Sequence, residues 1–256
     1  MSWSLHALPI LLTIAAWWGS TAVIARVVGR PQHTYRRLLG IASLLGVAGL
    51  ILNISLLQTL TISSAIGAFC AALAIWGWIE ITFLTGAVTG PPPAHAPRSH
   101  GLGRAIDALR AILWHELLII ATVVSVGLVT AGNDNELALL VLLLLWLMRS
   151  SAKLNLFLGV RNLGEGFLPP PLLHLLDFMQ KRRMNLLMPI SLLLGSAITL
   201  QCARDALEAT TPYAATSATM LATLALLAVF EHLLMILPLP AEHLWRWSLA
   251  NRRGVP

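Results

Sequence analysis

The sequence predicts an all-α, polytopic membrane protein that folds as a bundle of about seven transmembrane helices. Three observations predict this class: 57% of the 256 residues are apolar, only 11% are charged, and the mean hydropathy is +0.78. A soluble domain has about 25% charged residues, so this chain has too few to cover a soluble globule. The composition therefore excludes a cytosolic enzyme, a disordered chain and a disulfide scaffold.

The individual spans follow from length, because about 20 apolar residues cross a bilayer. The segments that meet this length are Leu8–Val28, Leu38–Leu60, Ser63–Val88, Ala111–Ala131, Leu137–Leu158, Leu186–Cys202 and Ala218–Leu237. We expect them to form a single transmembrane domain over residues 1–256. A transporter would need helix breaks in mid-bilayer, and Pro189 is weak evidence for one.

The basic residues predict the orientation, because lysine and arginine gather in cytoplasmic loops. Of the 17 lysines and arginines, only Arg204 falls on the side opposite to the others. The N-terminus is therefore expected in the periplasm and the C-terminus in the cytoplasm. The basic isoelectric point then reflects topology and attraction to membrane lipid, and we expect no nucleic-acid partner.

Two connections on the predicted cytoplasmic side, near residues 89–110 and 159–185, are long enough to have structure. Pro91–His100 is proline-rich and expected to be extended. The stretch after Pro171 alternates leucines with polar residues, which suits a segment lying in the interface before Lys181. Trp245 and Trp247 likewise suit the headgroup level.

Ionisable residues within the spans are the candidate functional residues, since each costs several kcal/mol to place in a bilayer. At 1.5 Å per residue, Glu80 lies roughly 12 Å and Glu231 roughly 10 Å from the cytoplasmic end of its span. The ionisable residues within the spans are Glu80, His115, Glu116, Arg149, Lys153, Glu231 and His232, and they share one layer in the cytoplasmic half of the bilayer. Asn155 completes the set of candidate functional residues.

Three interpretations of this layer remain open. The first is structural: the glutamates pair with Arg149 and Lys153 and fix the helix register, unless Lys153 instead extends to the interface. The second is a pigment or haem site, in which His115 or His232 ligates a central metal. The third is a non-haem metal centre that activates oxygen or polarises a substrate, with the ligands Glu80, His115, Glu116, Glu231 and His232.

Spacing argues against the metal centre. Bundle di-iron proteins repeat Glu-x-x-His, which places both ligands on one helix face. Here the pairs His115-Glu116 and Glu231-His232 are adjacent, so their side chains diverge by about 100°. On the fifth span, Arg149 and Lys153 share one face, and Ser151 and Asn155 share another.

Several of these segments also carry a family resemblance. They are Ile75–Gly86, Trp114–Glu116, Met148–Val160, Asn162, Phe167–Pro169, Arg183–Asn185 and Glu231–Trp247, and the run Ser151–Gly159 is the most specific. Together they resemble the PuhE family, the photosynthetic complex assembly proteins of purple and related bacteria. The resemblance covers roughly Trp76 to Trp247. Pro92-Pro93 and the residues after Arg183 depart from the family pattern.

The resemblance implies a role in building the photosynthetic reaction centre and light-harvesting complex in the bacterial cytoplasmic membrane. It implies reaction-centre or antenna subunits as partners, and bacteriochlorophyll as a pigment that the protein handles. We therefore expect an assembly factor that acts through the polar layer. The alternative is a membrane metalloenzyme that acts on a pigment or lipid at the same glutamates and histidines, and the sequence does not decide whether the protein is an enzyme.

Overall fold

The computed structural model describes residues 3–91 and 101–238. Seven of its helices are long and apolar enough to cross a membrane, as the sequence predicts. Their bounds are α1 Leu8–Val28, α2 Tyr35–Leu56, α3 Ile62–Leu84, α5 Leu113–Thr130, α6 Leu137–Leu158, α7 Leu187–Glu208 and α8 Pro212–Ile236. The shorter elements are η1 Trp3–Ala7, η2 Gln32–Thr34, α4 Gly101–Ala111, η3 Glu165–Phe167 and η4 Pro170–Phe178.

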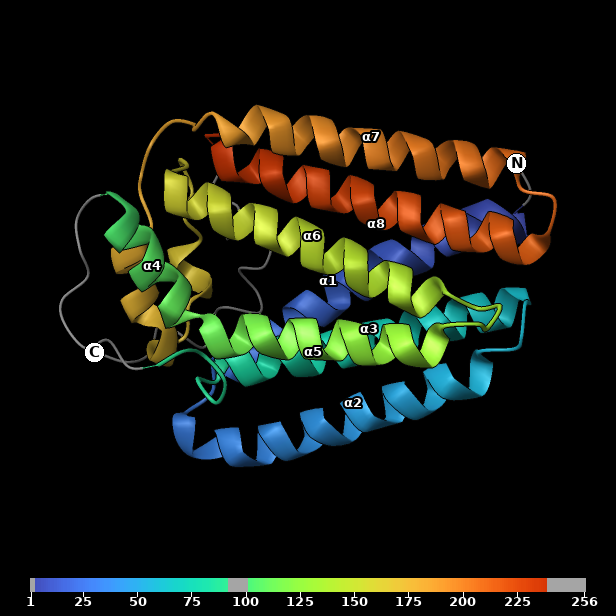
Figure 1. Cartoon of the computed structure of the whole chain (residues 1–256), viewed down its shortest axis with the longest axis horizontal. Coiled ribbons are helices and arrows are strands. Elements are labelled where there is room, and N and C mark those ends of the chain that lie inside the picture. The colour runs from blue at the N-terminus through green and yellow to red at the C-terminus, as the bar shows by residue number, and fades with distance from the viewer. Residues whose placement is uncertain (1–2, 92–100, 239–256) are drawn as a thin grey trace.

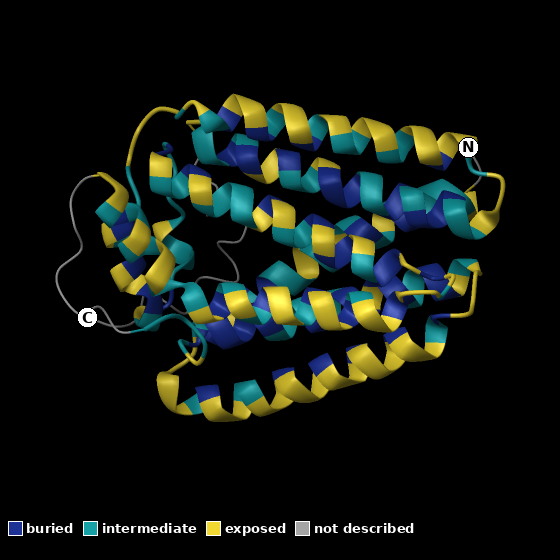
Figure 2. Ribbon diagram, in the orientation of Figure 1, coloured by how far each residue is buried: buried dark blue, intermediate teal, exposed yellow. Residues whose placement is uncertain are grey.

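The seven long helices lie side by side, with α2 and α7 at opposite edges of the bundle (Figure 1). Helix α2 packs on α3, α7 packs on α8, and α3 also contacts α1, α6 and α8. Helix α3 can occupy this central place because alanines cover its faces, and Ala65, Ala68 and Ala72 are fully buried. Buried residues line the inner faces, while α2 and α7 expose most of their outer surface (Figure 2).

One end of the bundle, which we call the basic end, is where α1, α3, α6 and α8 finish and α2, α5 and α7 begin. Among the described lysines and arginines, only Arg204 lies at the other end of the bundle. This arrangement is the one that the positive-inside pattern requires. Placing the basic end in the cytoplasm remains a prediction. Residues 92–100, expected to be extended, and Trp245 and Trp247, expected at the headgroups, lie outside the described residues.

Four predicted span ends need correction, and the first is that of α2, which finishes at Leu56 rather than Leu60. Helix α3 stops at Leu84, not Val88, because Gly86 takes a φ of +79°, which is outside the helical region. Glycine is required at this position, since a Cβ there would lie 2.8 Å from Pro171. Helix α7 continues past Cys202 to Glu208, with Asp205 accepting a hydrogen bond from Gln201 over 2.9 Å. Helix α8 begins at Pro212 rather than Ala218, since Thr211 caps it by accepting from the Ala214 amide. Pro189 lies in the first turn of α7, so it breaks no helix in mid-bilayer.

The other end of the bundle is held together by Asn135, which is 2% exposed. Its side-chain amide donates to the carbonyls of Leu56 and Thr59, each over 3.2 Å. Its side-chain oxygen accepts from the Tyr213 hydroxyl over 2.8 Å and from the Leu137 amide over 3.3 Å. One side chain therefore joins the α2–α3 connection to α6 and α8.

Helix α4 lies across the basic end, beside η4 (Figure 1). Arg104 anchors it by donating to the Phe157 carbonyl over 3.1 Å and to the Phe178 carbonyl, with its guanidinium 4.1 Å from the centre of the Phe157 ring. Burial, followed by the positive charge of Arg182, lowers the pKa of Arg104. Arginine is basic enough that the guanidinium nevertheless remains a cation.

Candidate functional site

Helix α6 carries the polar side chains that meet the other helices. Arg149 and Lys153 lie one turn apart on one face, and Ser151 and Asn155 lie one turn apart on another, as their spacing predicts. The first face forms ion pairs with α3 and α5. The second face forms hydrogen bonds with α7 and α8. We call these the charged face and the neutral face of α6.

Two ion pairs form on the charged face. Arg149 Nη2 donates to Glu80 Oε2 on α3 over 3.0 Å, and Lys153 Nζ lies 2.6 Å from Glu116 Oε1 on α5. The Lys153 and Glu116 side chains are 19% and 17% exposed, so this pair is largely buried. Lys153 therefore points to a glutamate rather than out to the interface. These pairs are the ones that the structural interpretation predicts for two of the three glutamates.

The neutral face continues through a chain of hydrogen bonds. Ser151 Oγ lies 3.0 Å from His232 Nε2 and 2.9 Å from Ser191 Oγ on α7. Asn155 donates to the same Ser191 hydroxyl over 2.9 Å and is fully buried. His232 Nδ1 donates to the Ala228 carbonyl over 2.8 Å, and its Nε2 lies against the Ser151 hydroxyl, whose proton is donated to Ser191. Helices α6, α7 and α8 are thus joined by hydrogen bonds on this face.

His115 lies apart from these networks. It is 0% exposed, and its ring stacks on Phe83 with the centroids 4.1 Å apart and an interplanar angle of 24°. Among the described residues, neither of its ring nitrogens has a hydrogen-bond partner. Its backbone amide donates to the Thr89 carbonyl over 3.0 Å, which fixes the start of α5 against the turn after α3. Burial and stacking fix this ring in one place.

Glu231 has a different partner from the one expected. It accepts a hydrogen bond from the Trp17 indole of α1 over 2.9 Å and is exposed at the surface of the structure. It also lies within electrostatic range of Arg149. Sequence reasoning missed Trp17, because no local pattern shows that α1 packs beside α8. Sequence reasoning also missed Ser191, a small polar residue on an apolar helix that only its neighbours reveal.

The predicted metal ligands are not grouped together in the structure. In the part of the chain that the structure describes, no three histidine, cysteine, aspartate or glutamate side chains are grouped to hold a metal ion. The adjacent pairs diverge: His115 stacks on Phe83 while Glu116 meets Lys153, and Glu231 meets Trp17 while His232 meets Ser151. The five predicted ligands therefore have separate environments.

The two histidines also fit poorly as pigment or haem ligands. Both nitrogens of His232 form hydrogen bonds, so an axial bond to a central metal would require one of them to break. Within the described part of the chain, the ring nitrogens of His115 have no hydrogen-bond partner, and an axial bond to a metal needs such a nitrogen. The ring is nevertheless fully enclosed, and a macrocycle could not approach it without separating α3 from α5.

Two asparagines complete the basic end near this layer. The Asn185 side chain donates to the carbonyls of Asn155 and Gly159 and accepts from the amides of Leu187 and Met188, over 2.8–3.1 Å. It therefore caps the end of α6 and the start of α7 together. Asn162 donates to the Leu234 and Leu237 carbonyls over 2.6 and 2.7 Å, which caps α8.

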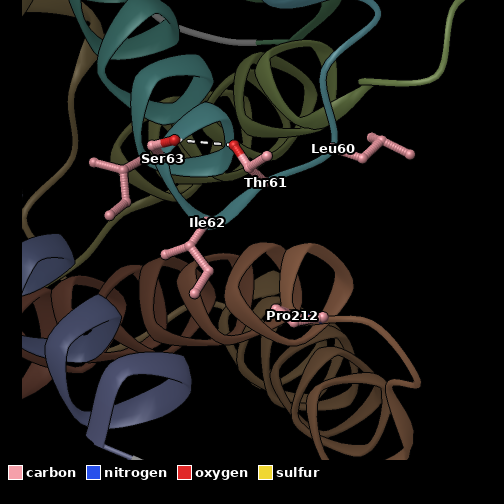
Figure 3. Close-up of a pocket in the computed structure, with 6 residues that line it drawn as sticks. Leu60, Thr61, Ile62, Ser63 and Pro212 are labelled. Atoms are coloured by element: carbon pink, nitrogen blue, oxygen red, sulfur yellow. Dashed lines mark hydrogen bonds between the residues drawn. The ribbon is translucent and has the colours of Figure 1, made fainter.

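A pocket lies at the other end of the bundle, away from the polar layer. Leu60, Thr61, Ile62, Ser63, Ile66 and Pro212 line it, and it has a volume of about 580 Å³. Figure 3 shows it between the start of α3 and the start of α8, with Thr61 and Ser63 joined by a 2.9 Å hydrogen bond. It is wide open, and Thr61 also caps α3, so we assign the pocket no chemistry.

The fold and the polar layer define a polytopic helical membrane protein whose helices are joined by ion pairs and hydrogen bonds within the bundle. The chain belongs to the family described as "Protein of unknown function (DUF3623)", whose model matches residues 3–255. A relative from Rhodobacter capsulatus is 34% identical over 248 residues, which are 94% of this chain and 90% of the relative. That relative is described as an uncharacterized 30.4 kDa protein in the puhA 5′ region. No solved structure matches the chain.

Proposed function

We propose that this protein is an integral-membrane factor that assists assembly of the photosynthetic reaction centre and light-harvesting complex. It acts by contacting membrane-spanning helices of reaction-centre or antenna subunits within the bilayer. The observation that carries the proposal is the puhA-region relative, which covers nearly the whole chain. The puhA region belongs to a photosynthesis gene cluster. The resemblance to the PuhE family supports the same role.

The polar layer supports a role in contacting other helices. Charged side chains inside a membrane are costly and face a partner or the bundle interior. Glu80, Glu116 and Lys153 are enclosed in pairs inside the bundle, whereas Arg149 is 43% exposed and Glu231 is exposed. The last two are the members of the layer that a neighbouring protein can reach. This protein would work in the bacterial cytoplasmic, or photosynthetic, membrane.

The proposal includes no pigment ligation and no metal chemistry. The histidine nitrogens are hydrogen-bonded in His232 and enclosed in His115, and the predicted metal ligands are dispersed. An assembly factor needs neither group, because it acts through contact surfaces. The metalloenzyme alternative therefore has less support from the geometry than the assembly role.

The test is deletion of the gene in the bacterium that encodes this chain, followed by spectroscopy of its membranes. We expect the near-infrared bands of assembled reaction centre and antenna to fall, while extractable bacteriochlorophyll remains free of accumulated precursors. Wild-type protein supplied in trans should restore the bands. Accumulation of a pigment precursor would favour the enzyme, and unchanged bands would contradict the assembly role.

A further inference from the structure

Glu231 is the carboxylate of the polar layer that lacks a cation. Glu80 and Glu116 each have a positively charged partner, at 3.0 and 2.6 Å. The partner of Glu231 is the neutral indole of Trp17, and no described lysine, arginine or histidine forms an ion pair with it. A carboxylate inside a span that faces outward without a cation is costly, so it indicates a missing partner.

The charges of the whole layer lead to the same conclusion. The described layer holds three carboxylates, at Glu80, Glu116 and Glu231, but two cations, at Arg149 and Lys153. Arg149 lies within electrostatic range of Glu231, yet its guanidinium is hydrogen-bonded to Glu80. The Glu80 carboxylate itself keeps one unused acceptor, because Glu80 is 7% exposed and its Oε1 has no hydrogen-bond partner among the described residues. One positive charge would balance the layer.

The position of Glu231 indicates where that charge comes from. It lies five residues before α8 ends at Ile236, which is about 7.5 Å along the helix. The ammonium of a lipid headgroup lies outside the span, so it would have to move inward by that distance. The exposed side chains beside Glu231 are Phe230 and, one turn further, Leu226, at 41% and 57%. A neighbouring membrane helix can lie on this apolar surface and reach Glu231 with a side chain.

We propose that Glu231 binds the positively charged side chain, lysine or arginine, of a partner membrane-spanning helix that lies against α8 beside α1. The assignment to a partner helix rests on the proposed function, because an assembly factor must contact such helices. Trp17 holds the Glu231 carboxylate in place through one oxygen and leaves the second for the incoming cation.

The test uses full-length protein in phosphatidylcholine nanodiscs and a synthetic leucine-alanine transmembrane peptide as the probe. One peptide carries a single lysine five residues from the end that inserts beside the basic end, and its match carries norleucine there. Energy transfer between labelled protein and peptide gives the two dissociation constants. We expect the lysine peptide to bind at least about tenfold more tightly, since buried charge pairs at interfaces couple strongly.

Variants of Glu231 test whether this residue causes the preference for the lysine peptide. Glu231→Gln should abolish the preference for lysine, while Glu231→Asp should retain most of it. The control Glu165→Gln, which changes a carboxylate outside the spans, should leave it unchanged. Equal binding of both peptides to wild-type protein, or an unchanged preference in Glu231→Gln, would overturn the proposal. Loss of the preference when phosphatidylethanolamine is added would assign the site to a lipid ammonium instead, which also overturns it.

This experiment contains no photosynthetic component. A lysine preference in nanodiscs together with normal complex assembly in the deletion strain would refute the proposed function and leave the cation site standing. The reverse outcome would leave the assembly role and remove Glu231 as its contact.

Discussion

Replacing Lys153 by methionine removes the cation of the Lys153–Glu116 pair and leaves a carboxylate enclosed among helices. At the observed 2.6 Å and an effective dielectric constant of about 20, the direct attraction is about 6 kcal/mol, most of which offsets the loss of hydration. Removing one partner of a buried pair costs about 3–5 kcal/mol. Since the two side chains retain 19% and 17% exposure, we expect about 3 kcal/mol for Lys153→Met.

The double variant Lys153→Met with Glu116→Gln separates the pair from the packing of its carbon atoms. Because it leaves no unpaired charge, we expect it to lose less than about 1 kcal/mol relative to wild type. The assay is the free energy of unfolding in mixed detergent micelles titrated with dodecyl sulfate and followed by circular dichroism. Lys181→Met is the control, because Lys181 and Glu165 are 4.0 Å apart and 72% and 56% exposed, and it should have no measurable effect. Additive losses in the double variant, or a loss under about 1 kcal/mol in Lys153→Met, would refute the reasoning.

Two further predictions concern the helix ends. Gly86→Ala should cost about 2 kcal/mol, because alanine resists the +79° φ and its Cβ would meet Pro171, whereas Gly77→Ala, with open space around it, should be neutral or slightly stabilising. Equal melting temperatures for the two variants would contradict this account of where α3 stops. Asn135→Ala should cost about 2 kcal/mol, since it removes the hydrogen bonds that Asn135 donates to the Leu56 and Thr59 carbonyls and accepts from the Tyr213 hydroxyl, while Asp134→Ala at the exposed neighbouring position should change little. Asn135→Ala should also speed amide exchange in the α2–α3 connection and in the α5–α6 connection. If exchange there is unchanged, Asn135 does not join these segments.

Composition and periodicity predict the membrane helices and the two faces of α6, because both depend on local spacing along one chain. The divergence of the adjacent pairs is also confirmed: Glu231 and His232 point to different helices, as do His115 and Glu116. These features need only the geometry of an α-helix.

Partner choice between helices is less predictable. The Glu231–Trp17 contact joins residues 214 positions apart, and nothing in the sequence near either residue specifies it. The predicted end of α3 is wrong for a related reason: the close approach of Pro171 to Gly86, which only glycine allows, exists only in the folded chain. The candidate functional residues themselves remain a prediction, since their positions show contacts and not roles.

The measurement that tests the account most directly is a charge exchange between Glu80 and Arg149 in the deletion strain. Glu80→Arg alone and Arg149→Glu alone each place like charges where the 3.0 Å ion pair lies, so either should reduce the assembled reaction-centre and antenna bands. The double variant restores opposite charges, and we expect it to recover a large part of those bands at equal protein level. Bands that stay as low in the double variant as in either single variant would show that this pairing across helices is not what the protein needs.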